Sequence, residues 1–411
     1  MSSETHRKSK INRRNYLRAL GTTGLAAGCL NTQRVSADES SKNNVEIVSG
    51  WVHTNRGDIR NGAPPKKEKI YDKIPAEEYR LTQAAHKKAI QIQDDIDNKF
   101  GDNLIKVGVT TDEPGSKKLR VNYTTHRVPV YQEKQESSGK EKYEEHRPNI
   151  KKSRIRSEVP ERASSTASAN GKKKEYWFDV EVVDRTRTYT AEYNSTYRPV
   201  PGGCQIEIKA EPGTAPVATA TCPIYHNDKS EWQILTAGHL FTENSGSDDI
   251  MQPVDGAYND KQIGTGDIKR FDSNDGDVKF DAGTVSINVD WTRKLAGKDG
   301  TYSNYIAHGN VSWDKISQEE GNENYTVKKQ GRTTGRKSGY INEVFPSDKE
   351  FRTSINAKRG DSGGPFFVDY KGDDVLMMGL VSWGSDKQDG EYQHSGGFSI
   401  ERVEDELPLS I

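Results

Sequence analysis

A glycine-rich hexapeptide, Gly360-Asp361-Ser362-Gly363-Gly364-Pro365, constrains the fold of this 411-residue chain more than any other stretch. Glycine lets the backbone turn tightly and lets amide N–H groups approach a neighbouring atom closely. Serine is a poor nucleophile at neutral pH unless a base removes its proton and donors hold the oxyanion that forms. The apolar run from Val375 to Trp383 follows and predicts a strand that holds this loop rigidly. Ser362 is therefore the candidate nucleophile.

Two further stretches supply a base and a carboxylate. A short apolar run ends on His239, and Asp281 lies inside the apolar stretch 278–285. A carboxylate in such surroundings is costly without a hydrogen-bonding partner, so we expect Asp281 to have one. With Ser362 these residues look like a Ser-His-Asp triad in the chain order His, Asp, Ser. Three other acids compete with Asp281 but lack its apolar flanks: Asp275, Asp277 and Asp290. The histidine that competes with His239 is His226, which lies in a predicted turn.

The C-terminal half resembles the trypsin/chymotrypsin superfamily of serine proteases. Ser382-Trp383-Gly384 matches the segment that lines the substrate cleft in that family, and Gly396-Gly397-Phe398 extends the match. Gln330-Gly331-Arg332-Thr333-Thr334-Gly335 is similar to the streptogrisin and alpha-lytic protease branch. The resemblance covers roughly residues 200–411 and implies an all-β, chymotrypsin-like fold of two six-stranded β-barrels. It also implies a serine endopeptidase that works through a covalent acyl-enzyme on protein or peptide substrates, with no metal or organic cofactor.

The resemblance assigns a role to each residue of the triad. Ser362 attacks the peptide carbonyl, His239 takes its proton and returns it to the leaving amine, and Asp281 fixes the imidazole tautomer. The backbone N–H groups of Gly360 and Ser362 form the oxyanion hole, where one donor is worth about 3–4 kcal/mol.

The same resemblance gives expectations for specificity. Asn356 stands six residues before the candidate nucleophile, where trypsin places an aspartate at the floor of its pocket. Gly384 and Gly397 match positions that keep the pocket open, which favours a large apolar or aromatic side chain before the scissile bond. Lys358 and Arg359 near the mouth would instead favour acidic residues. The expected substrate-binding residues are Asn356, Ser382, Trp383, Gly384 and Gly397.

The carboxylate beside the nucleophile needs a cation. In trypsin the matching carboxylate pairs with a new N-terminal ammonium after zymogen cleavage, but this chain has no Ile-Val-Gly-Gly start. In the alpha-lytic branch an internal arginine takes that role, and Arg332 matches it. The resemblance therefore implies a buried structural ion pair between Arg332 and Asp361.

The chain has three cysteines. Cys29 lies in a signal-like stretch, which leaves Cys204 and Cys222, an even number for an exported domain. In the family, a cysteine near the position of Cys222 pairs with one directly after the catalytic histidine, where this chain has Leu240. That departure leaves Cys204 as the partner in an expected disulfide, and two separate buried thiols are the alternative.

Charge divides the chain into two different halves. Residues 201–411 contain 22 Lys+Arg and 34 Asp+Glu, a net charge of −12. The whole chain contains 60 Lys+Arg and 61 Asp+Glu, so residues 1–200 contain 38 Lys+Arg and 27 Asp+Glu, a net charge of +11. The positive residues are scattered through polar sequence with few aromatics, so nucleic-acid binding is not expected. A basic pro-region paired with an acidic protease domain fits this asymmetry better.

The N-terminus carries an export signal. Arg13-Arg14 precedes a small-residue apolar segment that runs to about Leu30, which is typical of the twin-arginine pathway. Val35-Ser36-Ala37 is a small-residue cleavage site, so residues 1–37 are expected to be a removed signal peptide. Ala26-Ala27-Gly28-Cys29 also resembles a lipoprotein box, which leaves a lipid anchor at Cys29 as the alternative. Both predict a secreted protein with no other membrane attachment.

Residues 38–130 are expected to form a small α+β pro-region that leans on the protease. The apolar spacing predicts a helix over 76–100, and alternating runs at 105–109 and 119–123 predict a hairpin. Such a unit is marginal alone. An independent small domain of unknown role is the alternative.

The remaining chain divides at two composition changes. Residues 131–175 are charged and poor in apolar residues, which predicts a disordered linker, and 176–197 have the alternation of a strand-like connector. The serine protease domain is then expected at 198–411, as a monomer. Two other functions fit parts of the pattern: a non-catalytic homologue that uses the fold for binding, and an esterase with the same triad.

Overall fold

The computed structural model describes residues 43–100, 105–111, 115–129, 143–146, 150–188, 197–209, 217–242, 247–252, 261–274, 277–297, 301–358, 360–388 and 391–411. The expected signal peptide and Cys29 lie outside these ranges. We call residues 43–188 the N-terminal region and residues 197–411 the C-terminal domain. Of the helices within the described ranges, none combines the length and the apolar character needed to cross a bilayer.

The first half of the C-terminal domain is an antiparallel sheet in the order β10-β9-β13-β14-β15-β12-β11-β25. Successive side chains along its short strands point to opposite faces, so residues such as Ile206, Ile234 and Val285 lie together in one buried cluster. Its strands are β9 (Gln205–Ile208), β10 (Val217–Thr219), β11 (Pro223–His226), β12 (Glu231–Thr236), β13 (Asp249–Met251), β14 (Gln262–Asn274), β15 (Asp277–Ile287) and β25 (Leu409–Ser410).

The second half contributes its strands to a larger sheet. They are β16 (Trp291–Ala296), β17 (Tyr302–Val311), β18 (Val327–Gly331), β19 (Gly335–Gly339), β20 (Ile341–Phe345), β21 (Glu350–Thr353), β22 (Pro365–Asp369), β23 (Asp374–Gln388) and β24 (Glu391–Ser399). Helix α6 (Trp313–Gln318) follows β17, and α7 (Ile400–Glu406) follows β24. Two β units in series confirm the all-β, double-barrel class. Among the described residues the first sheet has eight strands, one of them β25, and strands of the N-terminal region extend the second sheet, so neither sheet has the expected six.

The helix and the hairpin expected in the N-terminal region are confirmed. Helix α4 (Ala76–Phe100) turns Ala85, Ala89 and Ile92 to one buried face. Strand β3 (Ile105–Thr110) pairs with β4 (Lys118–Pro129), with Val107 opposite Val121. The region also contains β1 (Asn44–His53), α3 (Arg56–Arg60), β2 (Lys67–Pro75) and β5 (Tyr143–His146).

The expected disordered linker is wrong for the described parts of residues 131–175, because residues 143–146 form β5, which pairs with β4, and residues 150–175 are also structured. This stretch contains α5 (Lys152–Glu158), β6 (Arg162–Ala169) and the start of β7 (Lys172–Thr188). Its few apolar side chains, among them the fully buried Ile155, pack in the same cluster as α4. The segment is too polar to fold alone, but α4 supplies the apolar surface that it lacks. The expected connector at 176–197 is the rest of β7 up to Thr188.

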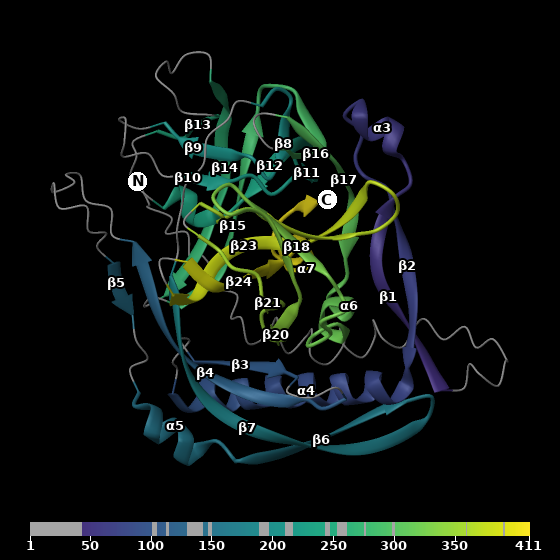
Figure 1. Ribbon diagram of the computed structural model, residues 1–411, viewed down its shortest axis with the longest axis vertical. Coiled ribbons are helices and arrows are strands. Elements are labelled where there is room, and N and C mark those ends of the chain that lie inside the picture. Colours follow the sequence, from purple (N-terminus) through teal and green to yellow (C-terminus); the bar gives the residue numbers. More distant parts are fainter. Residues whose placement is uncertain are drawn as a thin grey trace, which may run out of the picture.

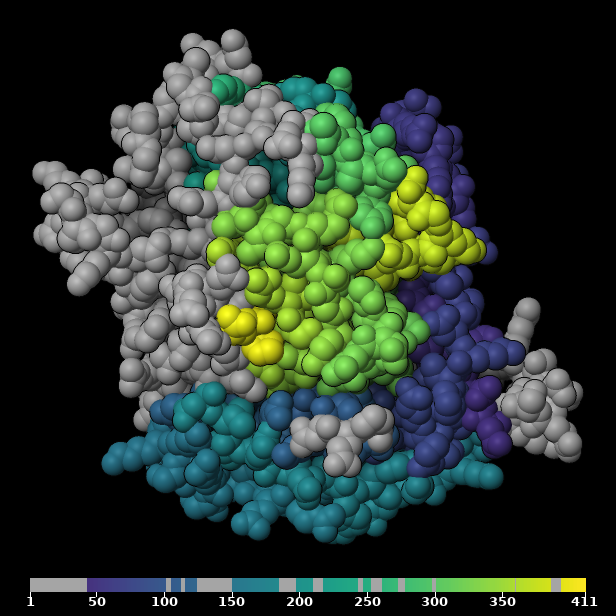
Figure 2. Space-filling view, in the orientation of Figure 1, coloured from purple at the N-terminus to yellow at the C-terminus, as the bar shows by residue number. Residues whose placement is uncertain are grey.

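The N-terminal region wraps around the C-terminal domain on two sides. Figure 1 shows α4, β3, β4, β6 and β7 beneath it and β1, β2 and α3 along one side. In Figure 2 the same segments, purple to teal, cover the base and one flank of the molecule. Backbone pairing joins the parts at three places: Gly50 opposite Val311, Val109 opposite Val344, and Thr188 opposite Gly384. Strand β8 (Val200–Gly202) begins the C-terminal domain.

Candidate active site

His239 and Asp281 lie together as the sequence predicts. The Nδ1 atom of His239 is 2.8 Å from Oδ2 of Asp281, and the His239 backbone N–H donates to Oδ1, also at 2.8 Å. The Asp281 side chain is fully buried and that of His239 is 18% exposed. An ionised carboxylate only accepts hydrogen bonds, so Nδ1 carries the proton, and in the neutral imidazole Nε2 has the lone pair. This is the tautomer that a general base needs.

Ser382 has a role that the sequence did not assign. Its hydroxyl donates to Oδ2 of Asp281, the oxygen that also accepts from His239. Ser382 is fully buried and belongs to β23, whereas Asp281 belongs to β15 of the first sheet. The bond therefore fixes the carboxylate from the second sheet. Strand β23 thus supports the candidate site in addition to bordering the expected substrate cleft.

Close backbone packing holds the turn that carries His239. The short 3₁₀ helix η3 (Gly238–Phe241) sits against β14 and β15. A Cβ on Gly238 would lie 2.1 Å from the carbonyl oxygen of Arg270, so only glycine fits. The ring of Phe271, directly opposite Asp281 in the sheet, meets the His239 ring edge-on with centroids 5.9 Å apart. Imidazole and carboxylate are therefore set on adjoining backbone elements.

The loop that carries Ser362 is tied to both sheets. Thr219, at the end of β10, donates its N–H to the Ser362 carbonyl at 2.7 Å and its hydroxyl to the Gly360 carbonyl. Gly363 has φ 80°, a conformation that favours glycine, and donates to the Val381 carbonyl at 2.6 Å. A Cβ on Gly363 would lie 2.9 Å from the nitrogen of Ala237, two residues before His239. The nucleophile loop therefore packs on the segment that leads to the base.

The expected oxyanion hole depends on two peptide planes. The Asp361 carbonyl accepts the Gly364 N–H at 2.8 Å, which fixes the plane that also carries the Ser362 N–H. Gly360 has φ 105°, which also favours glycine. Its N–H belongs to the peptide shared with residue 359, which lies outside the described residues. The pairing of these two donors stays a prediction.

The expected ion pair between Arg332 and Asp361 is wrong, because the cation that bonds Asp361 is Lys329. Its Nζ is 2.5 Å from Oδ2 of Asp361, and both side chains are fully buried. Lys329 and Gly331 share one face of β18, and a Cβ on Gly331 would lie 2.0 Å from Oδ1 of Asp361. The carboxylate therefore rests against that face. Arg332 lies past the strand end, where its backbone N–H donates to the Thr219 hydroxyl at 3.1 Å.

Further donors complete the shell around the Asp361 carboxylate. Oδ1 accepts backbone N–H groups from Thr333 and Thr334, at 2.9 and 3.1 Å. Oδ2 accepts the Thr334 hydroxyl at 2.6 Å and the Lys358 N–H at 3.1 Å. Burial lowers the pKa of Lys329, and the Asp361 charge opposes that shift. The stretch that the family resemblance singled out therefore holds Asp361 through its threonines and not through its arginine.

The expected disulfide is also wrong, since Cys204 and Cys222 are separate buried thiols. The Cys204 carbonyl accepts the Ala220 N–H, so the residue opposite Cys204 is Ala220, which is two positions before Cys222. Its Sγ donates to the Pro201 carbonyl at 3.1 Å and accepts from the Gln252 amide at 2.9 Å. The two side chains belong to different hydrophobic clusters. Burial raises the pKa of Cys204 to about 12, so this thiol is unreactive.

The expected substrate-binding residues fall into two groups. Ser382, Trp383 and Gly384 follow one another on β23, and Ser382 contacts the Asp281 carboxylate. Gly397 instead lies inside the sheet, opposite Val381, where a Cβ would lie 1.8 Å from the Leu380 carbonyl oxygen. Its small size is therefore needed for strand packing. Asn356 is half-buried between β21 and β22.

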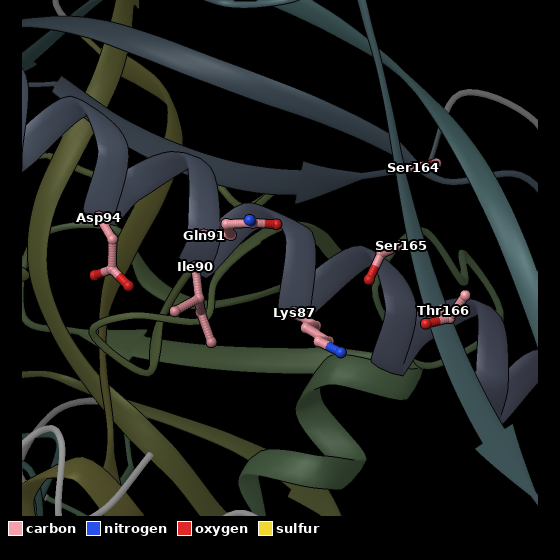
Figure 3. A pocket seen from close by; sticks show the side chains of 7 residues that line it. All are labelled: Lys87, Ile90, Gln91, Asp94, Ser164, Ser165 and Thr166. Carbon is pink, nitrogen blue, oxygen red and sulfur yellow. The ribbon is translucent and has the colours of Figure 1, made fainter. Parts of the chain in front are cut away.

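A groove of about 480 Å³ lies away from these residues (Figure 3). It runs between α4 and β6 in the N-terminal region, and its lining includes Lys87, Asp94 and Ser165. No predicted site residue lines it. Among the described residues, no group of three or more His, Cys, Asp or Glu side chains is arranged to hold a metal ion.

The buried Asp281 carboxylate, the His239 imidazole bonded to it, and the Ser362 loop packed on the segment that leads to His239 are the components that a serine hydrolase site requires. The Trypsin family model matches residues 217–400, which confirms the resemblance of the C-terminal domain to that family.

Solved structures of bacterial serine proteases are also similar in part. Nocardiopsis protease is 18% identical, with 51% of this chain and 97% of that chain covered and a TM-score of 0.35. Thermobifida fusca protease A is 19% identical, with the same coverage and TM-score. Cellulomonas bogoriensis chymotrypsin is 18% identical, with 52% and 97% covered and a TM-score of 0.35. A search among curated proteins found no match.

Proposed function

We propose that the protein is a serine endopeptidase that hydrolyses peptide bonds through a Ser362–His239–Asp281 triad. The observation that carries this proposal is the buried Asp281 carboxylate, which accepts from both the imidazole and the backbone of His239 at 2.8 Å. That arrangement leaves Nε2 as the basic nitrogen, and the loop that carries Ser362 packs on the segment that leads to His239. A binding module has no need of an oriented, proton-accepting imidazole.

The proposed reaction has two halves. Ser362 Oγ attacks the peptide carbonyl carbon while its proton passes to His239 Nε2, and the C–N bond breaks as that proton passes to the leaving amine. Water then attacks the acyl-enzyme ester, with His239 again taking and returning the proton. Asp281 stabilises the imidazolium formed in each half. The N–H groups of Gly360 and Ser362 stabilise the oxyanion.

The proposed substrate preference is a large apolar or aromatic side chain before the scissile bond. Its support is Asn356, a neutral residue where trypsin has a carboxylate, and the glycine at position 384. A panel of peptides that differ only at this side chain tests the preference. Preferential cleavage after Lys or Arg would contradict it, and cleavage after acidic residues would assign the specificity to Lys358.

We further propose export through the twin-arginine pathway and action as a monomer outside the cytoplasm. The support is the Arg13-Arg14 signal and the small-residue cleavage site at Ala37. The mass of the N-terminal peptide of the exported protein distinguishes cleavage after Ala37 from lipidation at Cys29. Replacement of both arginines by lysine should retain the protein inside the cell, and unchanged export would contradict the pathway.

Fluorophosphonate labelling of wild type and Ser362→Ala, measured by intact mass, tests the activity. Loss of a triad serine typically costs about a millionfold in turnover, so only wild type should be labelled and should cleave peptides. Ser385→Ala, in the same strand as Ser382, is the matched control and should label normally. Labelling with hydrolysis of esters but not of peptides would assign an esterase. A folded protein that does not label would contradict the proposal.

A further inference from the structure

Lys106 of the N-terminal region reaches into the C-terminal domain. Its side chain is 6% exposed, and its Nζ lies 2.9 Å from Oε2 of Glu350, whose side chain is fully buried. The same Nζ lies 3.4 Å from the carbonyl oxygen of Val278, on the strand that carries Asp281 three residues later. A buried lysine placed here is costly unless it is paired, so its ion pair with Glu350 and a longer one with Asp348, at 3.4 Å, fix its position.

Glu350 connects Lys106 to Trp383 of the expected substrate cleft. Its second oxygen, Oε1, accepts the indole N–H of Trp383 at 2.7 Å. Trp383 is 3% exposed, and its ring packs against Gly396, where a Cβ would lie 2.2 Å from the ring. Lys106, Glu350 and Trp383 therefore form one chain of bonds from the N-terminal region to the residue next to Ser382.

A second buried carboxylate of the C-terminal domain also takes its donors from the N-terminal region. Glu320 is fully buried, and its Oε2 lies 2.6 Å from the Lys117 Nζ and 2.8 Å from the Thr111 hydroxyl. Its Oε1 accepts the Thr111 N–H at 2.7 Å. Thr111 and Lys117 flank the turn between β3 and β4. Both ends of the β3 strand thus bond buried acids of the other part.

The two parts also share one hydrophobic core. A single cluster includes Ile92 and Val107 of the N-terminal region together with Val344, Met378 and Val381 of the C-terminal domain. Removal of the N-terminal region would expose this apolar surface to water along with Glu320 and Glu350. A segment that is discarded on maturation would leave the C-terminal domain without half of this core.

We propose that the N-terminal region is a permanent part of the working enzyme and that Lys106 is a positioning residue for Trp383. The proposal rests on the proposed peptidase activity. It replaces the expectation of a pro-region that is removed, because the retained region completes the core and fixes one wall of the cleft. A cleavage between residues 188 and 197 is compatible with it, provided that both pieces stay bound.

Native and denaturing mass spectrometry of the fluorophosphonate-labelled protein tests retention. The labelled species should contain residues 43–188 under native conditions, either as one chain or as a two-piece complex that separates only on denaturation. An active, labelled species made of residues 198–411 alone would overturn the proposal. An unlabelled complex would reject the proposed function instead, and the same spectra would still report whether the N-terminal region is retained.

Lys106→Met and Trp383→Phe test the positioning role. Both should raise KM for a peptide substrate about tenfold, the equivalent of one hydrogen bond to a charged group, while kcat changes less than about threefold. Because both act on the same indole N–H, the double variant should be no worse than either single variant. Lys87→Met, an exposed lysine of α4, is the control and should leave KM unchanged.

Glu350→Gln and Lys106→Arg keep the test decisive if Lys106→Met does not fold. Glu350→Gln keeps an acceptor for Trp383 and removes the ion pair between Lys106 and Glu350, while the longer pair with Asp348 remains, so KM should rise. Lys106→Arg keeps a cation, so its KM should equal that of wild type. Additive effects of Lys106→Met and Trp383→Phe, or a loss confined to kcat, would overturn the positioning role.

Discussion

At the scale of single residues, Asp361 illustrates how a carboxylate takes whichever cation the strand geometry presents. The Gly-Arg-Thr-Thr-Gly stretch pointed to Arg332, yet the side chain that reaches Asp361 comes from Lys329, three residues earlier. The face that Lys329 shares with Gly331 is where the carboxylate lies. Sequence position indicated the right segment, but which side chain faces the carboxylate depends on where β18 ends.

Lys329→Met should destabilise the protein by about 3–5 kcal/mol, because it leaves the Asp361 carboxylate buried without a cation. It should also slow labelling of Ser362, since Asp361 precedes this proposed nucleophile. Urea unfolding and labelling rate measure the two effects. Lys337→Met is the matched control, because this exposed lysine lies opposite Lys329 on β19. Equal stability of the two variants would contradict the structural role of the pair.

Glu207 predicts a pH dependence of stability. Burial raises the pKa of this glutamate from 4.5 to about 7. The folded state therefore holds a proton that the unfolded state has released, so stability falls as pH rises from about 4.5 to 7. Glu207→Gln should be more stable than wild type above pH 7 by up to about 3 kcal/mol and no more stable below pH 4.5. Parallel unfolding curves across pH 4–8 for both proteins would contradict this, and the exposed Glu323→Gln is the control.

At the scale of elements, the short η3 turn sets the position of His239, the proposed base. Gly238→Ala should abolish labelling of Ser362, because a Cβ there would lie 2.1 Å from the Arg270 carbonyl and push His239 away from Asp281. Gly57→Ala is the matched control, since no atom lies within 4 Å of a Cβ at that position. Labelling rate and melting temperature check both variants. Normal labelling of Gly238→Ala would show that the turn tolerates the displacement.

Elements with strong local patterns were predictable, and elements that depend on a partner were not. The apolar spacing over 76–100 predicted α4, and alternation predicted the β3–β4 hairpin, because each pattern lies within one segment. Strand β6 contains mostly serine and alanine, so its composition resembles a linker until it is set against β7 and α4. The unpaired thiols of Cys204 and Cys222 likewise depend on sheet register, which sequence spacing does not fix.

The same division holds within the candidate site. Ser362, His239 and Asp281 stood out because short motifs surround them. Thr219 and Ser382 were missed as supports because a lone hydroxyl carries no local signal, and each acts on a residue more than a hundred positions away. For Ser382, the neighbouring Trp383 and Gly384 drew attention to the substrate and away from Asp281.

At the scale of the whole molecule, the shared core predicts one unfolding transition. Calorimetry of the full chain should show a single peak, because Ile105 and Val107 of the N-terminal region pack with residues of the C-terminal domain. Ile105→Ala should lower that one transition, at a cost of about 2–5 kcal/mol. Trp177→Ala, at a side chain that is 59% exposed, should leave it nearly unchanged. Two separate peaks would show that the parts fold independently.

The pairing of Thr188 with Gly384 places β7 where it would compete with a bound peptide for the edge of β23. Under the proposed function, a bound peptide would hydrogen-bond to β23 from Ser382 outward, and β7 already occupies this edge from Gly384 onward. A tethered strand acts at an effective concentration in the millimolar range, far above that of most free peptides. Under that proposal, lengthening a substrate past the position of Gly384 should therefore bring little gain in affinity, because the added residues would have to displace β7.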